Sequence, residues 1–91
     1  MILSATENLL KAAEDSNTTP QTIENLIKAG ADVNARDDLG WTALMLADNP
    51  EVVNALFKAG ADVLAKDNNG RSALDYARND EIKRIILNAT K

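Results

Sequence analysis

Two helices with almost no connector between them are predicted by residues 37–63, which read DDLGWTALMLADNPEVVNALFKAGADV. The opening DDLG is typical of a turn, because Asp bonds its own backbone and Gly permits a left-handed conformation. Thr42 is placed to cap a short apolar helix, and Asn49 and Pro50 suit the cap and first position of a second helix. Gly60 then ends that second helix. The pattern predicts a turn, a short helix, a tight connector and a longer helix.

The same pattern returns 30 residues further along the chain (58 − 28). The hexapeptide KAGADV stands at residues 28–33 and again at residues 58–63. With this shift, ARDDLGWTALMLADNPEVVNALF aligns with AKDNNGRSALDYARNDEIKRIIL. A repeat of this length predicts stacked helical units, each of which buries its apolar face against its neighbours.

The two ends of the chain depart from the repeat. A helix of about Leu3 to Ala13 stands where the turn and short helix would be, and Thr19 caps the next helix. The C-terminal segment IKRIILNATK interleaves isoleucines with polar residues, as expected of a last unit whose outer face meets water. We therefore predict one all-α domain over residues 1–91, with units at about 1–31, 32–61 and 62–91.

The composition argues against an enzyme and against a metal or cofactor site. The chain has no cysteine and no histidine, which removes thiolate zinc sites, the commonest metal ligand and the commonest general base. A calcium loop built on Gly70 fails, because Ala65 and Tyr76 would occupy its first and twelfth positions. No glycine-rich phosphate loop is present. We expect a non-enzymatic protein with no cofactor and no metal.

The charge of the chain argues against nucleic acid and anionic membranes. The net charge is −4, whereas phosphate surfaces select for clustered lysine and arginine. The N-terminal segment lacks a basic region and carries Glu7, so a signal peptide is not expected. No apolar run approaches the roughly 20 residues of a membrane helix. The expectation is a cytoplasmic protein that does not bind membranes.

These repeats resemble the ankyrin repeat. The segment DDLGWTALMLA, followed by EVVNALFKAGADV, is similar to the family pattern D-x-x-G-x-T-P-L-H-x-A, a V-V-x-L-L helix and G-A-D, over about residues 20–88. The resemblance implies a solenoid of about three stacked helix-turn-helix units with projecting β-turn fingers. It also implies that the fingers and first helices form a concave surface that binds a protein partner.

Two departures from the ankyrin pattern affect this expectation. The family's proline and histidine are replaced in Thr42-Ala43-Leu44-Met45. That histidine usually joins neighbouring loops by hydrogen bonds, so we expect this stack to depend more on packing. The period is 30 residues instead of about 33, with the shortening next to Ala47. Because this trims the end of the first helix, we expect binding on the fingers.

The candidate partner-binding residues are those at which the two clear copies differ although their framework agrees. Turn tips also vary when nothing constrains them, so variation alone does not establish a binding site. Trp41 fits two roles, an interface hot spot or packing on the neighbouring finger. The candidates are Asp38, Leu39, Trp41, Met45, Asn68, Asn69, Arg71 and Asp75.

The leading hypothesis is a monomeric module that binds a protein partner. One alternative is a designed or selected scaffold with no natural ligand, which the absence of cysteine and histidine and the repeated deletion would also explain. The other is a structural module that associates with itself through its apolar end or the Trp41 region.

Overall fold

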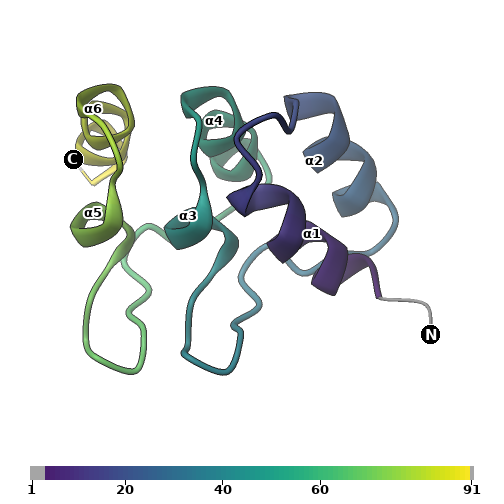
Figure 1. Cartoon of the computed structure of the whole chain (residues 1–91), viewed down its shortest axis with the longest axis horizontal. Coiled ribbons are helices and arrows are strands. Elements are labelled where there is room, and N and C mark those ends of the chain that lie inside the picture. Colours follow the sequence, from purple (N-terminus) through teal and green to yellow (C-terminus); the bar gives the residue numbers. More distant parts are fainter. Residues whose placement is uncertain (1–3, 91) are drawn as a thin grey trace.

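The helices form three pairs stacked in a row. The computed structural model describes residues 4–90, and the pairs stand side by side in Figure 1. The second helices of the pairs form one layer and the first helices form another, with contacts between successive helices in each layer. The helices are α1 (Ala5–Glu14), α2 (Pro20–Lys28), α3 (Ala43–Leu46), α4 (Pro50–Lys58), α5 (Ala73–Tyr76) and α6 (Asp80–Ala89).

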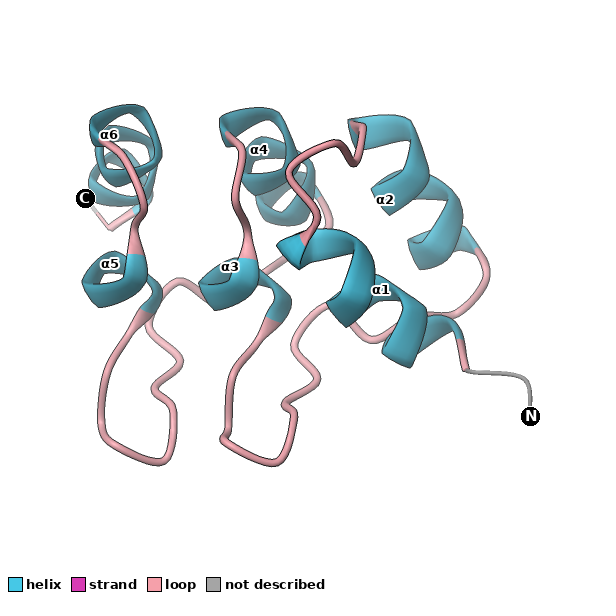
Figure 2. Ribbon diagram, in the orientation of Figure 1, coloured by secondary structure: helices cyan, strands magenta, loops and turns pink. Residues whose placement is uncertain are grey.

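Two loops project beyond the helices as fingers, which Figure 2 shows below α3 and α5. The first finger comprises residues 35–41 and the second comprises residues 65–71. Each closes through a backbone hydrogen bond across its turn, from Asp37 N–H to the Trp41 carbonyl oxygen (2.9 Å) and from Asp67 N–H to the Arg71 carbonyl oxygen (2.8 Å). The predicted all-α stack with projecting turns is confirmed.

The predicted helix starts are confirmed by their caps. The Thr42 hydroxyl oxygen accepts a hydrogen bond from Met45 N–H (3.4 Å), and the Asn49 side-chain oxygen accepts one from Val52 N–H (2.8 Å). These bonds satisfy backbone donors that the first helical turn leaves free. The N-terminal helix differs slightly from its expected span of Leu3 to Ala13. It starts at Ala5 and ends at Glu14, and Leu3 lies outside the described residues.

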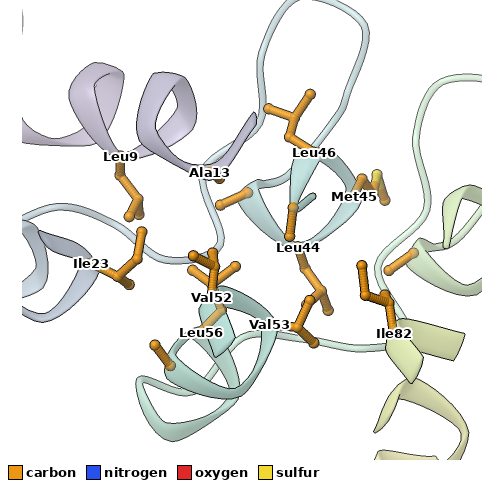
Figure 3. Packing of buried hydrophobic residues seen from close by; sticks show 14 of the residues in the cluster. Leu9, Ala13, Ile23, Leu44, Met45, Leu46, Val52, Val53, Leu56 and Ile82 are labelled. Atoms are coloured by element: carbon orange, nitrogen blue, oxygen red, sulfur yellow. The ribbon is translucent and has the colours of Figure 1, made fainter. Parts of the chain in front are cut away.

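The core is a continuous apolar strip between the two helix layers. Figure 3 shows its side chains converging from α1, α2, α3, α4 and α6. Aliphatic residues dominate it, so each unit depends on close contact with its neighbours for burial. The largest fully buried side chains are Leu9, Ile23, Met45, Val52, Val53, Leu56, Ile82 and Ile86.

Hydrogen bonds between units supplement this packing, which the absence of the family histidine had not led us to expect. The Asn34 side-chain oxygen accepts from Asp62 N–H (2.7 Å), one unit further along. The Asn49 amide group donates to the Thr18 carbonyl oxygen (3.1 Å) in the preceding connector. Asn49 therefore caps α4 and also ties the short α3–α4 connector to the unit before it.

No helix within residues 4–90 has the length and apolar character needed to cross a membrane. Nor does that part of the chain bring three or more acidic, histidine or cysteine side chains together in a way that could hold a metal ion.

Candidate functional site

The fingers and the first helices α1, α3 and α5 lie on the side of the molecule away from the second helices (Figure 1). We call this side the finger face. Asp38 and Leu39 stand at the tip of the first finger, and Asn68 and Asn69 stand at the tip of the second. All four are exposed, and the Leu39 side chain is 60% exposed. The structure therefore brings these four predicted residues together at two neighbouring tips.

Asn68 holds the two fingertips against each other. Its backbone N–H donates to the Leu39 carbonyl oxygen (3.1 Å), and its side-chain amide donates to the Asp38 carbonyl oxygen (3.1 Å). Inside the first finger, Asp37 Oδ1 accepts from the N–H groups of Leu39 and Trp41, both at 2.9 Å. These bonds fix the backbone that presents Leu39.

Trp41 packs on the next unit. Its ring lies 4.6 Å from the ring of Tyr76, centroid to centroid, with the planes inclined at 41°. Tilted aromatic pairs at this separation are favourable beyond the area that they bury. The side chain is half-buried. Trp41 thus contacts helix α5 of its neighbour, and its role in binding a partner stays a prediction.

Tyr76 also anchors the second finger, a role that the sequence analysis missed. Its hydroxyl donates to Asp67 Oδ2, while Asp67 Oδ1 accepts from the backbone N–H groups of Asn69 and Arg71 at 2.9 Å each. The bond from Tyr76 lowers the pKa of Asp67. The same bond raises the pKa of Tyr76. The nearly buried Asp67 carboxylate is fully engaged in holding its finger.

Met45, one of the candidate partner-binding residues, is not accessible to a partner. Its side chain is 1% exposed and belongs to the core (Figure 3). Helix α3 lies between α1 and α5, so both of its flanks are covered, whereas α5 has a described neighbour on one flank only. Asp75, the counterpart of Met45, is exposed, and its Oδ2 accepts from Ser72 N–H (2.9 Å).

The place of each unit in the stack explains part of the difference between the copies. Met45 is buried in the core and Trp41 contacts the following unit, whereas their counterparts Asp75 and Arg71 are exposed. Such pairs differ because one member lies between two described units and the other on a flank that no described unit covers. Variation between copies is therefore weaker evidence for partner binding at Asp75 and Arg71 than at the fingertips.

The finger face also has a hollow between α1 and the second unit. Its volume is about 260 Å³. A second hollow, of about 250 Å³, lies in the other layer, between α2 and α4. The hollow on the finger face is lined by Glu7, Leu10, Lys11, Glu14, Asp37 and Leu46.

Comparison with known protein families agrees with this architecture. The family described as ankyrin repeats (3 copies) matches residues 9–91. The chain belongs to the ankyrin-repeat family. Ankyrin repeats are generally protein–protein interaction modules, and the family is generally non-enzymatic.

The ankyrin chain is also similar to part of two much longer proteins. Mitochondrial disaggregase of Bos taurus is 54% identical over 39 residues, which are 43% of this chain and 6% of that protein. Mitochondrial disaggregase of Homo sapiens is 54% identical over 39 residues, again 43% of this chain and 5% of that protein. The match thus spans a small part of each relative's length.

Two side chains that join parts of this ankyrin stack can be recognised as hydrogen-bond donors in the sequence. Asn68 was selected because it differs from Asp38, but its amide is also the donor that joins the fingertips. Leu46 and Tyr76 occupy the same position in the two copies, and only the tyrosine can donate a hydrogen bond to its finger. Comparing aligned positions shows that both residues gain a donor, although it does not show which group each of them bonds.

Proposed function

We propose that this chain is a non-enzymatic module that binds a protein partner through its finger face. The observation that carries the proposal is the exposed Leu39 at the tip of a finger whose backbone is held by hydrogen bonds. An exposed apolar side chain on a rigid backbone gains free energy when a partner removes it from water. The proposed contact residues are Asp38, Leu39, Trp41, Asn68, Asn69, Arg71 and Asp75. Met45 is excluded because it is buried.

Rigidity supports this proposal on energetic grounds. Binding costs free energy for every loop and side chain that must become ordered at the interface. The bonds that Asn68 makes to the carbonyl oxygens of Asp38 and Leu39 fix the fingertips before any partner arrives. Less of the contact energy is then lost to ordering.

The test is a selection of binding peptides from a display library, followed by affinity measurements with variants. We expect Leu39→Ala to weaken the selected peptides about tenfold, which corresponds to about 1.4 kcal/mol. Asn54→Ala is the matched control, because Asn54 is exposed on α4 in the other layer. Unchanged affinity of every selected peptide for the Leu39→Ala variant would show that the fingertip is not the contact.

Trp41 needs a test that separates its two roles. The Trp41→Ala variant loses the contact with Tyr76 and should unfold at a lower urea concentration. A contact with the partner would add a loss of affinity under conditions in which the variant is fully folded. Affinity that matches the unaltered protein under those conditions would assign Trp41 to the stack alone.

The proposed module acts as a monomer. Sedimentation equilibrium over a wide concentration range measures this directly. A concentration-dependent rise in mass that Leu39→Ala abolishes would instead identify the finger face as a self-association surface.

A further inference from the structure

In the third unit, both carboxylate oxygens of the finger aspartate accept hydrogen bonds. In the second unit, only one oxygen of the corresponding aspartate accepts hydrogen bonds from described residues. In the third unit, Asp67 uses Oδ1 for the finger backbone and Oδ2 for the hydroxyl of Tyr76. In the second unit, Asp37 uses Oδ1 in the same way. The position that corresponds to Tyr76 holds Leu46 (76 − 30), which has no donor. Within residues 4–90, no hydrogen bond reaches Asp37 Oδ2.

The hollow of about 260 Å³ lies at this place, with Asp37 and Leu46 among its lining residues. This volume is below the roughly 300–1,000 Å³ of a typical small-molecule pocket, and it fits a protruding side chain better. Leu10 and Leu46 provide apolar surface in the hollow. The hollow thus lies beside Leu46, the residue aligned with Tyr76, and next to the finger aspartate that lacks a tyrosine donor.

The charges around the hollow select the kind of side chain. Glu7, Glu14 and Asp37 contribute three carboxylates and Lys11 one ammonium, which leaves two negative charges (3 − 1). A cationic side chain is attracted to this rim, and an acidic one is repelled. A long aliphatic stem can also lie on leucine while its charged end meets a carboxylate.

We propose that this hollow binds an arginine or lysine side chain from the partner, which donates a hydrogen bond to Asp37 Oδ2 and lays its stem on Leu10 and Leu46. The inference rests on the proposed function, because it names the chemistry of the partner on the finger face. The partner segment that fits this hollow has a basic residue flanked by apolar residues. The hydroxyl of Tyr76 on Asp67 is the internal precedent for the donor.

The test uses two synthetic peptides that differ in one charge. The first is acetyl-Gly-Leu-Arg-Leu-Gly-amide, and the second replaces arginine with citrulline, which has nearly the same shape but no charge. Each is titrated into the ¹⁵N-labelled protein at low salt and followed by the amide resonances. We expect the arginine peptide to shift the resonances of Lys11, Asp37 and Leu46 and to bind at least tenfold more tightly than the citrulline peptide. High salt should weaken this binding.

Two variants test the site itself. Leu46→Tyr introduces the arrangement of the third unit and should close the hollow, so that the arginine peptide binds at least tenfold more weakly. Asp37→Asn keeps a side-chain oxygen for the finger backbone but turns the outer acceptor into a donor, and the same loss is expected. The dispersion of the amide resonances reports whether each variant is folded.

Asn54→Ala is the control for this titration. Asn54 is exposed on α4 in the other layer and does not line the hollow, so this variant should bind the arginine peptide as the unaltered protein does. Equal binding of the two peptides, or shifts confined to α2 and α4, would overturn the basic-side-chain site. Binding of selected partners that Leu39→Ala weakens would meanwhile leave the proposed function intact.

Discussion

Replacing Gly40 and Gly70 by alanine, one at a time, measures how much the contact between fingertips contributes to stability. The two glycines occupy the same position in their fingers and have similar left-handed conformations, with φ of 82° and 78°. Their surroundings differ. A Cβ atom at Gly40 would lie 2.6 Å from Asn68 Oδ1 and 2.8 Å from Asn68 N, whereas one at Gly70 would meet nothing within 4 Å.

The expected losses of stability follow from these surroundings. Alanine in a left-handed conformation costs about 1–2 kcal/mol, and this cost applies to both variants. At Gly40 the new methyl group must also displace Asn68, whose two hydrogen bonds to the first finger contribute about 0.5–1.5 kcal/mol each. Gly70→Ala should therefore cost about 1–2 kcal/mol and Gly40→Ala about 2–5 kcal/mol.

Urea unfolding followed by far-ultraviolet circular dichroism measures both losses, with Gly70→Ala as the matched control. Similar slopes of free energy against urea would show that both variants unfold from a comparably compact state. The reasoning predicts that Gly40→Ala unfolds at the lower urea concentration. Equal losses at Gly40 and Gly70 would refute the claim that Asn68 locks the fingertips together.

Three further perturbations have defined outcomes. Thr42→Ala removes the α3 cap and should lower the free energy of unfolding by about 1 kcal/mol in a urea titration. Met45→Asp buries an unpaired carboxylate and should lower the free energy of unfolding by at least about 3 kcal/mol. Asp75→Met, at the exposed counterpart, should lower it far less, and thermal unfolding of both variants measures the difference. Because Tyr76 lowers the folded-state pKa of Asp67, the ionised carboxylate stabilises the fold above its unfolded pKa of about 3.9, and this contribution is lost as the pH falls through the folded value. Tyr76→Phe should therefore show a smaller loss of stability below about pH 4 in pH-dependent unfolding, and an unchanged acid profile would contradict the bond.

The stack could be predicted from the sequence because its signals are local and occur twice. The cap residues Thr19, Thr42 and Asn49 mark helix starts, and all three have the expected side-chain hydrogen bonds. The repeat of KAGADV fixes the register between units. These features depend on neighbouring residues or on a regular period, both of which a single sequence displays directly.

The burial of Met45 and the contact of Trp41 with Tyr76 could not be predicted from the sequence. Both depend on which flank of a unit is covered by the next one. A difference between copies looks the same whether it reflects a partner or a position in the stack. Met45 and Asp75 differ for the second reason, which only the arrangement of α3 between α1 and α5 makes clear.

The bonds of Asn68 show a further limit of the sequence. An asparagine in a turn is expected to bond its own backbone, and here it joins a finger 30 residues away. The hollow beside Leu46 likewise requires α1 to lie next to the first finger. Contacts between units decide the shape of the finger face, and local patterns do not specify them.

The most direct test of the central claim is the footprint of a selected peptide on the amide resonances of the ¹⁵N-labelled protein. Binding on the finger face predicts that the largest changes fall in residues 35–41, residues 65–71 and α1. Changes concentrated in α2, α4 and α6 would contradict it, because those helices form the other layer of the stack.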